Sequence, residues 1–297
     1  MSQTRSPSAQ RAYGLARVCR VWELPRSTVY AARPSTPAAP PGRRGPKPPW
    51  SDAALLERIR AVLAASPFVG EGHRKVWARL RAQAVRTSKP RVLRLMREAG
   101  LLAPTRVGPP RGPAAHDGTI LTERPDELWG TDATSCVTLG EGTATIFVAV
   151  DHCTAECMGI HAAKVGTRFE ALEPLRQGVR AAFGTYAAGC ALGLAVRHDH
   201  GSQFMSDHYQ AELRFLGIES SPAFVRAPEG NGCAERFIRT LKEQLLWVLT
   251  FATVEELRRA LLRFKTRYNH EWLIERHGHQ PPAAIRAAHV RAVPVAA

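Results

Sequence analysis

The sequence contains little cysteine and no long apolar run. Six cysteines in 297 residues are too few and too dispersed for the disulfide framework of a small secreted protein. The longest uncharged apolar stretch, residues 187–196, is far shorter than the ~20 residues that a membrane-spanning helix needs. The first ten residues also lack the apolar segment of a signal peptide. The sequence therefore predicts a cytoplasmic protein with no membrane partner.

Acidic residues are scarce in the first two-fifths of the chain. Residues 1–122 hold 22 Lys and Arg against 6 Asp and Glu, whereas residues 123–297 hold 19 against 20. The net charge of +15 therefore lies entirely in the front part. Charge alone would also fit a membrane surface or an acidic protein partner, but a basic region on a nearly neutral body is typical of DNA-binding proteins.

The basic front part is predicted to be helical. Residues 11–31 suggest two short helices interrupted at Pro25, which is a helix-turn-helix outline, and a Pro-rich linker follows. Residues 51–103 suggest three more helices, two of which begin at the capping residues Ser51 and Ser88. A solvated basic face is the alternative to a DNA contact for their cations. We predict that five of these cations contact DNA: Arg74, Lys75, Lys89, Arg91 and Arg94.

The pattern changes at residue 123 to alternating strands and helices. Strands are predicted at 128–138, 145–150, 156–163, 193–198 and 218–221, and helices at 167–183, 206–216 and 233–249. The chain then ends in a helix at 253–268 and a Pro-rich tail. The order β-β-β-α-β-α-β-α indicates an α/β fold in which helices cover a mixed sheet.

Three carboxylates occupy positions that suit metal chemistry. Asp132 lies inside the first predicted strand, Asp199 ends the fourth, and Glu235 lies in the first turn of the long helix, with 35 residues between Asp199 and Glu235. An ionised Asp in an apolar strand is costly to bury unless it is paired or binds a metal. Mg²⁺ prefers carboxylate oxygens, and two such ions can stabilise both oxygens of a phosphoryl displacement. We therefore predict that Asp132, Asp199 and Glu235 are both catalytic residues and metal ligands.

Two cations follow Glu235 on the same face of the long helix. Arg239 and Lys242 lie four and seven positions further on, so they align with Glu235 along the helix. We predict that Arg239 and Lys242 bind DNA along this line. The alternative is an ordinary surface ion pair between Glu235 and Arg239.

A zinc site is the other reading that the polar residues suggest. His152, Cys153, Cys157 and His161 are close in sequence. They fall on a predicted hairpin, where alternate residues point to opposite faces, so we do not expect them to bind zinc. Asp151, at the end of the second strand, is interpreted as a turn residue.

Three blocks of sequence resemble the catalytic motifs of the D,D(35)E transposases and integrases: WGTDAT, HDHGSQF and NGCAERFIRTLK. The resemblance is narrower with the second-reading-frame products of the IS-three family of bacterial insertion sequences. FVGEGHRKVWARLR and SKPRVLRLMREAGLL are similar to the helix-turn-helix module of that family, and YNHEWLIERHGHQPPAAI to its C-terminal end. The likeness covers roughly residues 51–287.

The resemblance implies a ribonuclease-H-like catalytic core preceded by small all-α helix-turn-helix modules. It implies two Mg²⁺ or Mn²⁺ ions at Asp132, Asp199 and Glu235. Relatives cleave the 3′ ends of their element and use the freed 3′-OH to attack DNA, with no covalent protein–DNA intermediate. The implied partners are the terminal inverted repeats, target DNA, further copies of the chain and a protein of the upstream frame. Many relatives have Asp-Asn-Ala before the catalytic helix, where this chain has Gly230-Asn231-Gly232, a change that removes no ligand.

Six segments follow from these patterns: a helix-turn-helix segment at 1–33, a linker at 34–50, a helical DNA-binding domain at 51–107, a linker at 108–122, the catalytic core at 123–250 and a C-terminal helix and tail at 251–297. Two alternatives to a transposase remain. A ribonuclease H would use Glu170 or Glu173 in place of Glu235. A DNA-binding remnant would use only the basic front part.

Overall fold

The computed structural model describes residues 3–32, 49–104, 120, 122–223 and 231–292. The chain divides into two compact units, Met1–Pro49 and Trp50–Ala297. Nearly all of the two predicted linkers, 34–50 and 108–122, and the last residues of the tail lie outside the described residues. Within the described part of the chain, no helix has the length and apolar character that crossing a membrane requires.

The first unit contains two short helices, α1 (Leu15–Val21) and α2 (Arg26–Ala32). They are separated near Pro25, as the sequence predicts. Among the described residues of this unit, Cys19 is the one buried side chain, and Val21 and Trp22 are exposed. The unit thus has almost no hydrophobic core of its own.

The second unit begins with three helices: α3 (Asp52–Ala65), α4 (His73–Ala82) and α5 (Lys89–Glu98). The predicted caps are present, because the hydroxyls of Ser51 and Ser88 accept hydrogen bonds from backbone N–H groups one turn into α3 and α5. Apolar residues at helical spacing form one buried cluster, which includes Leu55, Ile59, Val76, Leu80, Val92, Leu95 and Met96.

A five-stranded sheet follows, with the strand order β3-β2-β1-β4-β5. Its strands are β1 (Leu128–Thr138), β2 (Gly142–Asp151), β3 (Cys157–Ala163), β4 (Ala195–His198) and β5 (Glu219–Pro222). β1, β2 and β3 are antiparallel, whereas β4 runs parallel to both β1 and β5. β1 is therefore the central strand, paired on both sides.

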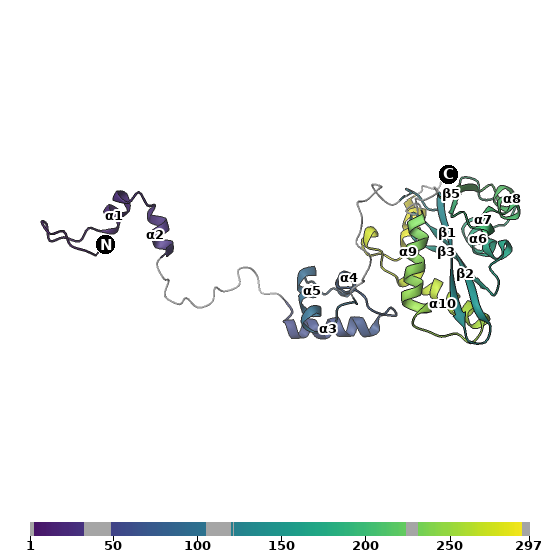
Figure 1. Cartoon of the computed structure of the whole chain (residues 1–297), viewed down its shortest axis with the longest axis horizontal. Helices are drawn as coiled ribbons and strands as arrows, with labels where there is room; N and C mark the ends of the chain where they lie inside the picture. Colours follow the sequence, from purple (N-terminus) through teal and green to yellow (C-terminus); the bar gives the residue numbers. More distant parts are fainter. Residues whose placement is uncertain (1–2, 33–48, 105–119, 121, 224–230, 293–297) are drawn as a thin grey trace. The chain divides into compact units, whose positions relative to one another are not determined.

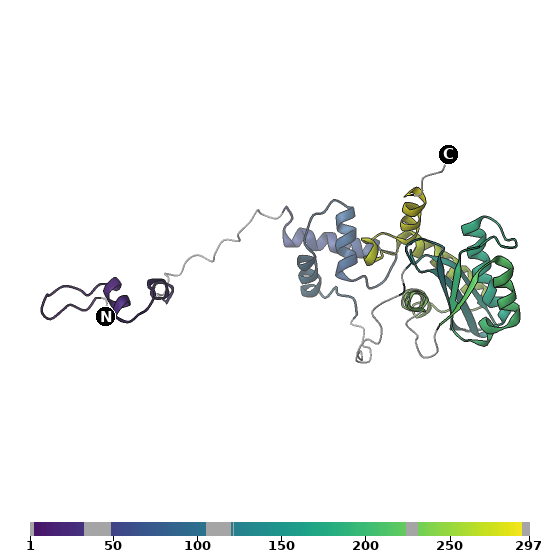
Figure 2. The ribbon, with the colours of Figure 1, turned by 90° about the horizontal axis from the view of Figure 1, so that it is seen from above.

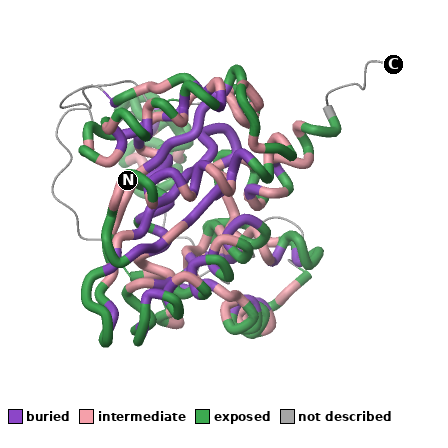
Figure 3. Tube along the Cα trace, turned by 90° about the vertical axis from the view of Figure 1, so that its right-hand side faces the viewer, coloured by how far each residue is buried: buried purple, intermediate pink, exposed green. Residues whose placement is uncertain are grey.

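Helices cover both faces of this sheet (Figures 1 and 2). One layer contains α6 (Arg168–Phe183), α7 (Ser202–Met205) and α8 (Asp207–Leu216), and the other contains α9 (Gly232–Leu241) and α10 (Val254–Glu271). Each layer forms its own apolar cluster with the strands, which concentrate the buried residues (Figure 3). Alternate residues of β2 divide between the clusters, because Phe147 faces one layer and Ile146 the other. This mixed sheet between two helical layers confirms the predicted ribonuclease-H-like α/β fold.

Close packing of α6 on the sheet depends on two glycines. A Cβ atom at Gly159 in β3 would lie 1.9 Å from the carbonyl oxygen of Pro174 in α6. A Cβ atom at Gly178 in α6 would lie 2.7 Å from the ring of Trp129 in β1. Both distances are shorter than any contact that real Cβ atoms make, so only glycine fits at these positions.

Two predictions about the C-terminal region were wrong. The long helix does not remain regular to residue 249, because it changes at Lys242 into the π-helical turn η2 (Lys242–Leu246). The Pro-rich tail contains the helix α11 (Pro282–Ala292), preceded by the short turn η3 (Glu275–His277). Pro282 occupies the first position of α11, where proline lacks no needed donor and its fixed φ suits a helix.

Candidate active site

The pairing of β1 with β4 brings the two predicted aspartates to neighbouring strands. Gly130 of β1 is the register partner of Arg197 of β4, and the strands run parallel. Asp132 and Asp199 each lie two residues beyond that pair, at the same edge of the parallel region. Asp132 is half-buried, and its carboxylate accepts a hydrogen bond of 2.7 Å from the N–H of Ala133. Asp199 is exposed, and its carboxylate accepts one of 2.9 Å from the N–H of Gly201.

The start of α9 is attached to β1 beside Asp132. The side-chain amide of Asn231 donates a 2.8 Å hydrogen bond to the carbonyl oxygen of Thr131. A Cβ atom at Gly130 would lie 2.6 Å from Oδ1 of Asn231 and 2.8 Å from Nε2 of His152, so this close approach requires glycine. Glu235 lies in the first turn of α9, which is therefore held against the strand that carries Asp132.

The charge environment of Asp132 includes both other acids. Burial, followed by the negative charges of Asp199 and Glu235, raises the pKa of Asp132 to about 6, while the Ala133 N–H and the positive charge of Lys242 lower it. Burial also raises the pKa of Glu235. The structure thus places Asp199, Glu235 and Lys242 within electrostatic reach of Asp132.

A cation suits this set of residues. Two further carboxylates and one ammonium act on the half-buried Asp132, so the charge around it is negative and partly desolvated. Within the described ranges, however, no group of three or more His, Cys, Asp or Glu residues lies close enough to hold a metal ion as the side chains stand. The donor set fits Mg²⁺ in chemistry, and the side chains of Asp199 and Glu235 are exposed, so rotation can bring their oxygens closer to Asp132.

Asp132→Asn is expected to stabilise the metal-free protein at neutral pH. Because the folded-state pKa of Asp132 is raised from 3.8 to about 6, the ionised carboxylate costs stability. This cost is absent below pH ~4, grows as the pH rises and is complete above pH ~7, where it is about 3 kcal/mol. Thermal unfolding in EDTA should show the variant melting above wild type at pH 7.5, with a smaller difference at pH 4.5. The exposed Asp207→Asn is the control, and equal shifts for both variants at both pH values would contradict the expectation.

The two cations predicted on the helix after Glu235 differ in their surroundings. Arg239 is exposed and forms an ion pair of 3.6 Å with Glu243, so the predicted alternative, a pair with Glu235, is not the one observed. Lys242 is half-buried at the start of the π turn and acts on the charge of Asp132.

Most of the cations predicted to bind DNA from α4 and α5 have partners inside the protein. Arg74 forms a 2.8 Å ion pair with Glu275, and the ammonium of Lys75 lies 2.8 Å from the ring centre of Trp272. Lys89 is exposed, with its ammonium 4.5 Å from the ring centre of Trp77. A DNA contact by Arg74 or Lys75 would have to compete with these interactions.

The sequence predicted that Arg91 and Arg94 contact DNA, but both side chains of α5 are bound to another helix. Both donate 2.6 Å hydrogen bonds to Asp52 at the start of α3, and Arg91 also donates to the carbonyl of Trp50. These bonds, from Arg94 first and then Arg91, lower the pKa of Asp52. The helical period could not reveal them, because Asp52 is far away in sequence.

The sequence did not predict a connection between the three-helix domain and the π turn that follows α9. The side chain of Gln244, in the π turn, accepts from the N–H of Val69 at 2.8 Å and donates to its carbonyl at 2.9 Å. Next to Val69, Phe68 is buried in the cluster of α9 and α10 and contacts Trp272 edge-on with ring centres 4.9 Å apart. No local pattern signals these contacts, which join residues 175 and 204 positions apart.

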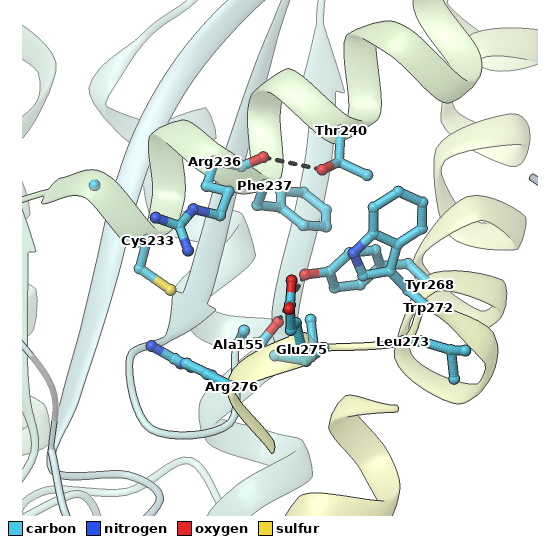
Figure 4. Close-up of a pocket in the computed structure, with 12 residues that line it drawn as sticks. Ala155, Cys233, Arg236, Phe237, Thr240, Tyr268, Trp272, Leu273, Glu275 and Arg276 are labelled. Atoms are coloured by element: carbon cyan, nitrogen blue, oxygen red, sulfur yellow. Dashed lines mark hydrogen bonds between the residues drawn. The ribbon is translucent and has the colours of Figure 1, made fainter. Parts of the chain in front are cut away.

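A cavity of about 170 Å³ lies beside a face of α9 other than the one that carries Glu235 (Figure 4). Arg236, Phe237 and Thr240 line it from α9, and Tyr268 and Glu275 line it from the C-terminal region. Its one acid is Glu275, which is already paired with Arg74. The cavity therefore lacks the carboxylates that the predicted chemistry needs.

The two acids of the ribonuclease H alternative have partners of their own. Glu170 accepts or shares a 2.5 Å hydrogen bond with His161 of β3, and Glu173 receives one from Gln177. The charge environment of Asp132 includes Glu235. Asp151 is a fully buried turn acid, bound by the N–H groups of Asp126 and Thr154.

Comparison with known proteins adds two domain matches. The family model of an HTH-like domain matches residues 50–108, and that of an integrase core domain matches residues 216–282. A transposase InsD of insertion element IS2 from Escherichia coli is 28% identical over 246 residues, which are 80% of this chain and 79% of that protein. A longer Escherichia coli protein, the uncharacterized 48.2 kDa protein of insertion element IS2A, is also 28% identical, and the match spans 82% of this chain but only 58% of that protein. Among solved structures, the catalytic core of BIV integrase has a TM-score of 0.42 and 20% identity, covering 56% of this chain and 97% of that one.

The fold and the matched domains define a protein with an HTH-like DNA-binding domain followed by an integrase core. Its curated relatives include the transposases of an insertion element. The predicted resemblance to the transposases of the IS-three family is therefore confirmed.

Proposed function

We propose that the chain is a DNA transposase of the D,D(35)E type, which cleaves the ends of its element and joins the freed 3′-OH to target DNA. The observation that carries the proposal is the charge environment of Asp132, which includes both Asp199 and Glu235. The three acids come from the central strand, the neighbouring parallel strand and the start of α9. Carboxylates converging from separate elements are what phosphoryl transfer with two metal ions requires.

Asp132, Asp199 and Glu235 would hold Mg²⁺ or Mn²⁺, as the pair of ions that the resemblance implies. When bound, two such ions would stabilise the attacking and leaving oxygens of the displaced phosphate. Asp132 supplies a fixed, half-buried ligand, since β1 is paired on both sides. Asp199 and Glu235 are exposed and can adjust when DNA arrives.

The remaining residues of the site would bind and orient the DNA. Arg239 and Lys242 follow Glu235 along the helix, so a phosphate of the DNA end can lie across this line and present its phosphodiester to the acids. The exposed Lys89 would contact the backbone of the recognised DNA from the helical domain. The nucleophile is water in cleavage and the 3′-OH in joining, with no protein–DNA bond.

The partners follow from the reaction. The HTH-like domain would bind the terminal inverted repeats, and joining two ends to one target calls for more than one copy of the chain. A protein from the upstream frame of the same element would add a further DNA-binding segment.

The test uses the full chain and a labelled duplex that carries an end of the element. With Mg²⁺ we expect a specific 3′-cleaved product and, with added target DNA, a joined product, and EDTA should remove both. Cleavage of an RNA–DNA hybrid alone would favour a ribonuclease H. Tight binding without cleavage of any of several element ends would favour a DNA-binding protein.

A further inference from the structure

A second cavity, of about 280 Å³, shares Lys242 with the surroundings of Asp132. It is lined by Ser135, Cys136 and Val137 at the end of β1 and by Lys242, Leu246, Trp247, Leu249 and Thr250 after α9. Lys242 belongs to both places, because it lines this cavity and also acts on the charge of Asp132. The indole of Trp247 is 72% exposed, which is unusual for so large an apolar side chain.

The π turn explains why Trp247 faces this cavity. The N–H of Trp247 donates to the carbonyl oxygen of Lys242 at 2.9 Å, five residues back, where an α-helix would use Leu246 as the donor. The wider turn accommodates one extra residue and moves Trp247 toward the side that carries Lys242. Glu235, Lys242 and Trp247 thereby follow one another along one side of the helix. Isolated π turns within α-helices are frequent at functional sites.

The lining of the cavity favours nucleic acid over a protein partner. An exposed aromatic ring next to a cation is the arrangement on which proteins stack unpaired bases while they bind the phosphate backbone. The hydroxyls of Ser135 and Thr250 add polar contacts. No carboxylate is among the lining residues, so an apolar protein surface would bury the ammonium of Lys242 without an anion at this place.

We propose that this cavity is a nucleobase subsite, in which an unpaired base at the DNA end stacks on Trp247 while Lys242 holds the adjoining phosphate. The proposal rests on the transposase function, since it is the reacting DNA end that would bring a base to the helix of Glu235. In this proposal Trp247 is a positioning residue. It holds the unpaired base once the terminal base pairs of the DNA end have opened.

The test measures binding in EDTA, where no cleavage occurs. Two duplexes of the same element-end sequence are compared by fluorescence anisotropy, one fully paired and one with two mismatched terminal pairs. Wild type should prefer the frayed duplex by about 10-fold. Trp247→Ala should remove this preference and Trp247→Phe should keep most of it. Phe215→Ala, which truncates an aromatic ring on α8 that is 48% exposed, is the matched control and should keep all of it.

Several outcomes would overturn the subsite. The first is a wild-type protein that binds both duplexes equally well. The second is a Trp247→Ala variant that still prefers the frayed duplex. If the mass of this variant in light scattering also falls, the surface joins copies of the chain instead of binding a base. Metal-dependent cleavage, measured on the same preparations, reports separately on the proposed function. Cleavage without a Trp247-dependent preference leaves the transposase and removes the subsite, whereas the preference without cleavage removes the transposase and keeps the subsite.

Discussion

Asp199→Asn is expected to abolish strand cleavage and joining by the proposed transposase, with a loss of about 10³-fold or more, while DNA affinity changes little. The substitution keeps the shape of the side chain and its hydrogen bond from Gly201, but removes the charge that would hold a metal ion. Several kcal/mol of transition-state stabilisation then disappear, and each 1.4 kcal/mol is tenfold in rate. Because Asp199 is exposed, the fold should not suffer. Rates on a labelled element end, with binding measured in parallel, check both halves of the expectation.

Two further variants serve as controls for the Asp199→Asn experiment. Asp207→Asn changes an equally exposed aspartate of the next helix and should retain wild-type rates. If the three acids act as one site, the double variant Asp199→Asn with Glu235→Gln should be no slower than the worse single variant. Cleavage by Asp199→Asn at more than a tenth of the wild-type rate would remove Asp199 from the site.

Arg286→Ala should destabilise the second unit by about 3–5 kcal/mol. Arg286 of α11 donates hydrogen bonds of 2.6 and 3.1 Å to Asp126, is paired with Glu156 and lies 4.0 Å from the fully buried Asp151. Its own side chain is 19% exposed, so the three acids would be left without their shared cation in a poorly solvated place. Urea unfolding of the full chain, followed by far-UV circular dichroism, measures the loss.

Arg291→Ala is the matched control, since it removes an exposed arginine from the same helix. It should change the free energy of unfolding by no more than about 0.5 kcal/mol. A loss below about 1 kcal/mol for Arg286→Ala would mean that water or rearranged side chains satisfy the three acids.

The sheet could be predicted because its strands carry local signals. The apolar run around Phe147 and the segment that ends at Asp199 gave strands whose positions differ from the observed ones by a few residues at most. The three acids could be chosen because Asp132 stands inside an otherwise apolar strand, Asp199 at a strand end and Glu235 in the first turn of a helix, each within a recognisable block. The strand order adds that Asp132 and Asp199 lie at the same edge of two neighbouring strands, since sequence alone does not state that β4 pairs with β1.

The interactions of the cations could not be predicted in the same way. Helical spacing shows which residues share a face, but it does not show that Asp52 receives Arg91 and Arg94 or that Trp272 lies over Lys75. These contacts join elements that are distant in sequence. The sequence did not predict the π turn for a different reason. A single widened turn leaves the apolar spacing of the helix almost unchanged before Leu245.

The link between Gln244 and Val69 has a consequence for engineering and for evolution. DNA-recognition domains of related elements would not be interchangeable by cutting in the linker, since the loop around Phe68 and Val69 is bound to the turn that ends the catalytic helix. A chimera with a foreign recognition domain should retain wild-type solubility only when the host loop, or a matching residue at position 244, travels with it. A boundary at which the recognition domain could be exchanged therefore lies within the helical domain, after the loop around Phe68 and Val69 and before α5.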